Sequence, residues 1–229
     1  MPGLRELAAS VHVCRRCPRL LDWCQRVAQV RRAAYCDETY WGRPVAGFGD
    51  QAARLMLVGL APAAHGANRT GRLFTGDRSG DFLFQALYRA GLANQPVSRS
   101  RDDGLQLNYT YVTAIVRCAP PANRPTAIER SACRPWLEAE LDLLPDLQVV
   151  VALGGEAWRQ MIALYRDRGD YAGRRVPRFG HGTEIAIGTR TMIGSYHPSQ
   201  QNTFTGRLTS DMLDAVLARA CEIARVTPR

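Results

Sequence analysis

Three uninterrupted apolar runs of strand length limit the folds that are open to this chain. They are RLMLVGL at 54–60, YTYVTAIV at 109–116 and VVVAL at 149–153. A run without polar alternation is typical of a parallel strand that is buried on both faces. Segments with helical patterns separate the runs. This alternation predicts a parallel sheet with helices on both faces, a three-layer αβα fold.

Capping residues and apolar spacing place the helices. Thr126 and Glu129 have the spacing of a capping box, which predicts a helix to about Leu144. The other helices are expected at 4–32 with a break at Cys17-Pro18, from Ser79 or Asp81 to near Gly91, from 154 onward and at 210–225. Residues 35–50 look irregular, and 183–196 predict one or two more strands. All 229 residues fit a single domain that carries an N-terminal helical segment.

The charge balance favours a polyanionic partner. Lys and Arg number 30 against 21 Asp and Glu, which gives a net charge of +9. The positive charge is carried by arginine, whose guanidinium binds phosphate and stacks on bases. An ordinary basic enzyme is the alternative interpretation. The sequence has no apolar run near the ~20 residues of a membrane span and no signal-peptide pattern, so we expect a cytoplasmic protein.

In a reducing compartment, cysteines indicate metal ligands or buried thiols before disulfides. Cys14 and Cys17 form a C-x-x-C pair in the break between helices, Cys118 follows the second strand, and Cys133 lies on the next helix. Clustered thiolates bind soft metals and iron–sulfur clusters, but spacing alone leaves zinc, a 4Fe–4S cluster and buried free thiols open. The cysteines without such context are interpreted as core or incidental: Cys24, Cys36 and Cys221.

Sites in parallel sheets lie beyond the carboxyl ends of the strands, which selects the loops 61–77, 117–125 and 197–207. Each residue has a functional and a structural interpretation. Phe74 either stacks on a base or packs in the core, and Asp77, the one acid of its loop, is either a site residue or the start of a helix. Asn123 either orients water or forms a turn, and His197 either donates a hydrogen bond to a leaving group or has a structural role. The short polar residues that follow suit a DNA groove or the gap left by a flipped base: Ser199, Gln200, Gln201 and Asn202.

Together these segments resemble the uracil-DNA glycosylase superfamily, and most closely its iron–sulfur family five, or B type. The motifs are GLAPAAHGANRTGRLFTGD, VRCAPPANRPT and H-P-S, and the resemblance extends from Cys14 to about Arg207. It implies a central four-stranded, mostly parallel sheet. It implies that Phe74 stacks on the flipped base beside Ala61 and Pro62, that His197 bonds to a base carbonyl, and that Arg207 contacts DNA. The ligands of a structural 4Fe–4S cluster would be Cys14, Cys17, Cys118 and Cys133.

The chain departs from the sister branch of that family at two positions. Leu60 stands where that branch has an acid, and Ala114 stands where it has an asparagine. By resemblance to the B type, Asp77 and Asn123 take over the polar chemistry. A small Ala114 reads no base edge, which predicts acceptance of hypoxanthine and xanthine as well as uracil.

The sequence therefore predicts a monomeric, monofunctional glycosylase that flips a deaminated base out of duplex DNA and leaves an abasic site, at the nucleoid. A non-catalytic iron–sulfur module that binds damaged DNA is the first alternative, because Leu60 replaces an acid. A nucleotide hydrolase with a phosphate-binding loop is the second. The sequence after Gly71, Arg72-Leu73, counts against it because the P-loop pattern is missing.

Overall fold

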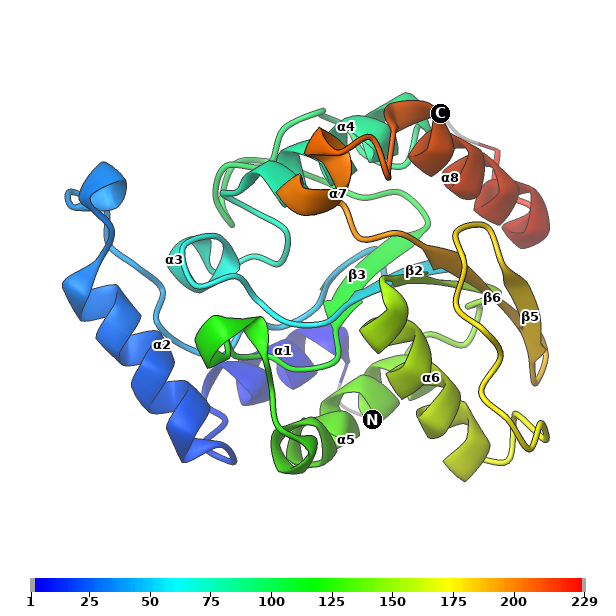
Figure 1. The fold of residues 1–229 in the computed structure, drawn as a ribbon, viewed down its shortest axis with the longest axis horizontal. Helices are drawn as coiled ribbons and strands as arrows, with labels where there is room; N and C mark the ends of the chain where they lie inside the picture. The colour runs from blue at the N-terminus through cyan, green and yellow to red at the C-terminus, as the bar shows by residue number, and fades with distance from the viewer. Residues whose placement is uncertain (1–2, 228–229) are drawn as a thin grey trace.

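The computed structural model describes residues 3–227 and contains one six-stranded sheet between two layers of helices (Figure 1). The strand order is β1-β3-β2-β4-β6-β5. Four parallel strands form the centre: β2 (Leu55–Gly59), β3 (Thr110–Ala114), β4 (Val149–Leu153) and β6 (Arg190–Ser195). The three-layer αβα prediction is confirmed.

The predicted strand count of four was too low, because an antiparallel strand flanks the parallel set at each edge. β1 (Phe48–Gly49) pairs with β3, and β5 (Glu184–Ile187) pairs with β6. β1 lies in residues 35–50, which were expected to be irregular. Two residues are too few for any periodicity to appear in the sequence.

The apolar runs became strands because both faces of the sheet are covered. All residues of β2, β3 and β4 are buried. Leu55, Leu57 and Val112 pack into one core with α4 (Arg78–Arg89) and α8 (Ser210–Ala224). Met56 and Val58 face the other core, with α5 (Ala127–Asp142) and α6 (Gly155–Asp167). Alternate side chains of one strand thus enter different cores, as the two helical layers in Figure 1 illustrate.

The N-terminal segment consists of α1 (Leu4–His12), α2 (Pro18–Val30) and the short 3-10 turn η1 (Ala33–Tyr35). The break expected at Cys17-Pro18 is confirmed, since Pro18 begins α2. α2 lies at the far left of Figure 1, outside the two helical layers. Its Leu20 and Cys24 pack against Cys118 and Ala119, beyond the end of β3.

The connections that follow the parallel strands contain short helical turns. α3 (Ala67–Thr70) interrupts the loop after β2, the 3-10 turn η2 (Pro121–Asn123) follows β3, and α7 (Gln200–Phe204) follows β6. Parallel strands end on one side of a sheet, so these turns lie at a common edge. No helix within residues 3–227 is long and apolar enough to cross a membrane.

Candidate active site

A cavity of about 310 Å³ opens at the edge where the parallel strands end. All three loops selected from the sequence contribute to it, together with the end of β2. Its lining residues are Leu60, Ala61, Ala63, Leu73, Phe74, Asp77, Ser79, Asn123, His197 and Ser199. The floor is largely apolar, and few polar groups face the space, as is usual for a site that binds a small planar ligand.

Phe74 and His197 place two flat rings beside each other in this cavity. Their centroids are 6.0 Å apart and their planes differ by 32°. Phe74 has φ 52°, a left-handed conformation that a bulky residue rarely adopts. Its ring lies on Gly59, where a Cβ would come within 2.6 Å of Phe74 Cζ. Glycine at the end of β2 is therefore required for the position of the ring.

Asp77 is both the start of a helix and an acidic residue of the cavity, the two interpretations that its sequence position allows. It is the N-cap of α4, where its Oδ1 accepts a hydrogen bond from Gly80 N at 3.0 Å, and its side chain lines the cavity. A Cβ on Gly66 would lie 2.2 Å from Asp77 Oδ2, so the loop approaches the carboxyl closely. Burial raises the pKa of Asp77 above its ordinary value, against the opposing effect of the backbone N–H groups of Gly80 and Ser79.

His197 presents a neutral imidazole. Burial lowers the pKa of His197 to about 4, so the ring carries no charge at neutral pH. Neither ring nitrogen has a hydrogen-bond partner within residues 3–227, which leaves both for a ligand. The backbone carbonyl of His197 accepts a hydrogen bond from Asn202 Nδ2 at 2.8 Å. Asn202, expected in a DNA groove, therefore uses its amide to hold the histidine backbone.

Asn123 lies at the rim of the cavity. It is exposed and has φ 56°, a left-handed conformation that asparagine tolerates. It follows Ala122, with φ 52°, in the turn made by the prolines of this loop. Its side chain makes no hydrogen bond within the described chain. The amide is thus free to meet a ligand at the mouth of the site.

The remaining predicted residues lie around this centre. Pro62 and Ala114 are buried and do not line the cavity; Ala114 packs in the core cluster against which Phe74 also rests. Gln200 and Gln201 are exposed on α7. The Arg207 guanidinium stacks over the Tyr196 ring, 4.7 Å from its centroid.

Sequence reasoning missed the arginine that braces the loop after β2. Arg69 is 9% exposed, its Nε donates to His65 O at 2.8 Å, and an Nη donates to Gly76 O at 2.7 Å. Its guanidinium also pairs with Glu38 and lies over Tyr35, 3.9 Å from the ring centroid. These bonds close the loop around α3. The sequence carries no signal for them, since arginine is mostly exposed.

Sequence reasoning also missed an exposed aromatic ring beside the site. Phe204, the last residue of α7, is 66% exposed, and the Arg78 guanidinium lies 5.2 Å from its ring centroid. The signal for it in the sequence is a lone aromatic residue at the end of a polar segment.

The four predicted ligand cysteines meet at a small cavity between the break in the N-terminal helices and α5. Cys14, Cys17, Cys118 and Cys133 all line it, whereas Cys36 is exposed and Cys221 lies elsewhere. Within residues 3–227, no three His, Cys, Asp or Glu side chains are arranged to hold a single metal ion.

The surroundings of the four thiols suit thiolate ligands. The backbone N–H of Arg117 donates to Cys133 Sγ at 3.3 Å. Arg117 is buried beside the same cavity, and its Nε has no hydrogen-bond partner in the described chain. Burial raises the pKa of Cys133 to about 11, opposed mainly by the charge of Arg117. Such thiols need a cation or a metal to ionise, so the donor set fits a soft metal or an iron–sulfur cluster.

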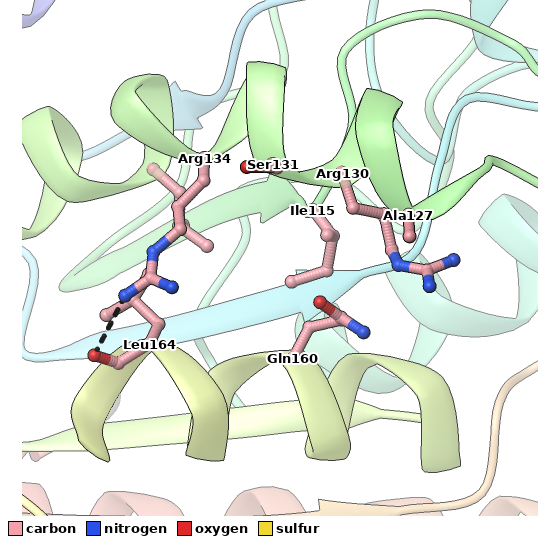
Figure 2. A pocket seen from close by; sticks show the side chains of 8 residues that line it. Ile115, Ala127, Arg130, Ser131, Arg134, Gln160 and Leu164 are labelled. Atoms are coloured by element: carbon pink, nitrogen blue, oxygen red, sulfur yellow. Dashed lines mark hydrogen bonds between the residues drawn. The ribbon is translucent and has the colours of Figure 1, made fainter. Parts of the chain in front are cut away.

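A further cavity, of about 160 Å³, lies between α5 and α6 and contains none of the predicted site residues (Figure 2). Arg130 and Arg134 point into it from α5, and Gln160 faces them from α6. Arg134 donates to Leu164 O at 3.2 Å and pairs with Glu138 and Asp167. These acids neutralise Arg134, so its charge is not available to a ligand in the cavity.

The site at the strand ends has the volume and the aromatic wall that suit one flat heterocycle, with the neutral His197 imidazole beside the Phe74 ring. Such a site is suited to an enzyme that acts on a single nucleobase. The family model described as "Uracil DNA glycosylase superfamily" matches residues 46–221 of this chain.

Curated relatives narrow the assignment. A "Type-5 uracil-DNA glycosylase" of Mycobacterium leprae is 54% identical over 227 residues, covering 98% of this chain and 97% of that protein. One of Thermus thermophilus is 50% identical over 216 residues, covering 94% and 95%. Among solved structures, wild-type SMUG2 of Pedobacter heparinus superposes with a TM-score of 0.47 at 12% identity, over 76% of each chain. The chain belongs to the uracil-DNA glycosylase superfamily and, within it, to the type-5 uracil-DNA glycosylases. It is therefore an N-glycosyl hydrolase that acts on DNA.

Proposed function

We propose that this glycosylase releases hypoxanthine and xanthine as well as uracil from duplex DNA, and leaves an abasic site. The observation that carries the proposal is the lining of the cavity. Its floor is apolar, from Leu60, Ala61, Ala63 and Leu73, and Asn123 is the one amide among its lining residues. A site with few edge-reading groups discriminates weakly among the flat bases, of one ring or two, that its volume of about 310 Å³ admits. Normal bases are then rejected by the cost of extrusion, which is lowest at mismatches.

In the proposed reaction, Phe74 stacks on the extruded base and His197 donates a hydrogen bond to its carbonyl. The C1′–N bond breaks, and its electron pair leaves with the base. A neutral imidazole suits this role because negative charge develops on the oxygen that it meets. Burial keeps His197 neutral, so it acts as a donor that is already in place and not as a titrating acid.

Asp77 and Asn123 line the same cavity, and we assign them to the side that receives the sugar. We assign to the Asp77 carboxylate the stabilisation of the oxocarbenium-like sugar and the orientation of water toward C1′. The water oxygen adds to C1′, and its proton passes to the carboxylate or to solvent. Asn123, at the open rim, holds the water or the base edge. Asp77 thus supplies the carboxyl that is missing at Leu60.

We further propose that Cys14, Cys17, Cys118 and Cys133 hold a 4Fe–4S cluster. When bound, it cross-links the N-terminal helices to the sheet and takes no part in the hydrolysis. The convergence of the four thiols beside Arg117 supports this assignment.

The experiment that tests the substrate range compares release of uracil and hypoxanthine from otherwise identical duplexes. We expect the two rates to agree within about a hundredfold, because one missing edge contact is worth about 1–3 kcal/mol. Ala114 does not line the cavity but lies in the core against which Phe74 rests, so Ala114→Asn should shift the ratio toward uracil by bringing a longer, amide-bearing side chain to the base edge. A wild-type enzyme that leaves hypoxanthine in place while it releases uracil would contradict the broad range. An unchanged ratio in a folded Ala114→Asn protein would remove Ala114 from the explanation.

A further inference from the structure

A groove of about 740 Å³ runs along the flank of the sheet beyond β1. α1 borders it with Arg5 and His12, and the segment before β3 borders it with Arg101 and Gln106. We propose that this groove binds the phosphodiester backbone of the DNA arm on one side of the flipped base. The inference rests on the proposed action on duplex DNA and extends it to a second contact surface.

The groove carries positive charge that the protein does not neutralise. Within residues 3–227, Arg5 has no carboxylate partner, and Arg101 has only the exposed Asp102 at 3.6 Å. Exposed pairs of this kind contribute little. Arg43, which does not line the groove but shares the Trp41 ring with Arg101, has no carboxylate partner in the described chain either. Free guanidinium groups that line one groove are the usual footprint of a phosphate backbone.

The acids near the groove are occupied by the local backbone. Asp50 accepts hydrogen bonds from Ala52 N at 2.9 Å and from Tyr109 N at 2.8 Å. Asp103 accepts from Arg72 at 2.8 Å and from Arg99 N at 2.6 Å. Asp103 thus neutralises Arg72, which also lines the groove, but neither carboxylate pairs with Arg5 or Arg101.

A tryptophan fixes two of the arginines in place. The Arg43 and Arg101 guanidinium groups lie 4.0 Å and 4.6 Å from the Trp41 ring centroid, and His12 packs edge-on at 4.9 Å. Stacking uses the face of a guanidinium and leaves its N–H edge for phosphate. His12 adds no charge, because burial and then the two arginines lower its pKa. A preorganised donor loses less entropy when it binds.

The groove and the active-site cavity share one loop. Gly71 and Arg72 line the groove, and the next two residues, Leu73 and Phe74, line the cavity. Trp41 N donates to Arg69 O at 2.8 Å, so the loop that Arg69 holds is bonded to the tryptophan on which Arg43 and Arg101 stack. DNA whose base lies in the cavity therefore leads one of its arms toward the groove. This continuity favours DNA over an acidic peptide as the occupant.

The test uses two duplexes in which uracil lies about five base pairs from one end or from the other, with the long arm spanning about two helical turns. Only one of the long arms reaches the groove. The variant is Arg5→Ala with Arg101→Ala. The control is Arg174→Ala with Arg175→Ala, two exposed arginines in the segment that joins α6 to β5, the edge strand opposite β1.

We expect the groove variant to bind the duplex with the reaching arm at least about tenfold more weakly, and the salt slope to fall by about 1.8 for two lost phosphate contacts. The other duplex and the control variant should bind as the wild type does. If the groove and control variants bind the two duplexes with the same affinity, the proposal is overturned. Binding of an acidic peptide in the groove would not rescue it. Equal weakening on both duplexes would overturn it too. Uracil release from the other duplex, measured separately, reports on the proposed function itself.

Discussion

Burial acts in opposite directions on the two titratable groups of the cavity. It raises the pKa of Asp77 and lowers the pKa of His197, so each neutral form is favoured. The neutral form of His197 is the one that donates a hydrogen bond to the base without titrating. Asp77 must instead be ionised to act, although burial favours its neutral form, so Asp77 is the group expected to govern the pH profile.

The rate of uracil release should fall as pH falls through the raised pKa of Asp77, because protonation removes the negative charge that favours the sugar cation. His197 should contribute no limb near pH 6.5, since its pKa is about 4. A single-turnover pH profile checks both statements, with Asp77→Asn as the comparison. The acidic limb should disappear in that variant. A limb near pH 6.5 that vanished in His197→Gln would assign the titration to the histidine.

Asp77 also caps α4, and two substitutions separate this role from catalysis. Asp77→Ala removes the cap and should lower the free energy of unfolding by about 1 kcal/mol. Asp77→Asn keeps a cap of similar quality. Because the folded-state pKa is raised, the ionised carboxyl costs stability above that pKa, so Asp77→Asn should be neutral or stabilising at pH 7. Urea unfolding measures both; a loss in Asp77→Asn as large as in Asp77→Ala would contradict this division.

Sequence reasoning identified the residues of the cavity better than it identified their support. The position of Asp77 before a helix, and of His197 after a strand, follows from local pattern. Arg69 and Arg72 were not foreseen as buried braces, because charge predicts exposure and their partners lie in distant segments. Asn202 was expected to face DNA, yet its amide binds a backbone carbonyl five residues earlier.

At the scale of elements, the strands that follow apolar runs were predicted to within one or two residues, whereas β1 was not predicted. β4 begins and ends where the apolar run does, since a strand covered on both faces has no polar positions. The capping box of α5 formed as the sequence predicts, with Thr126 and Glu129 bonded to each other's backbone. β1, α3 and α7 are too short to produce a period, so tertiary contacts decide them.

The end of β2 offers a test of the stacking role of Phe74. In Gly59→Ala the new Cβ would meet the Phe74 ring at 2.6 Å and push it from its place. Loss of a stacked ring is worth about 1–3 kcal/mol, so uracil release should slow by roughly five- to a hundredfold. Single-turnover release and a thermal melt measure this together. Full activity in a folded variant would show that the position of the ring is not needed.

At the scale of the whole molecule, the N-terminal helices are fastened to the sheet near the four cysteines. Spacing alone pairs Cys14 with Cys17, the family resemblance added Cys118 and Cys133 to the set, and the fold brings all four to one cavity. The flank groove likewise joins segments far apart in the chain. Sequence periodicity carries no information on which distant segments of the chain come into contact in the fold.

Replacing one of these cysteines tests the proposed cluster. Cys118→Ser should abolish bound iron and visible absorbance, and should lower the melting temperature because the cross-link is lost. Cys36→Ser, at an exposed position, is the matched control and should keep both. A wild-type protein without iron, or iron retained equally in both variants, would contradict the assignment.

The central claim is that the strand-end cavity performs base release and that Asp77 supplies its charge. The most direct measurement is single-turnover release of uracil opposite guanine from a labelled duplex, with alkali to cut the abasic site, for wild type and Asp77→Asn. We predict strand scission by the wild type and a rate lower by tens- to about a thousandfold in the variant, with duplex binding unchanged. Equal rates in the two proteins would place the chemistry on other residues.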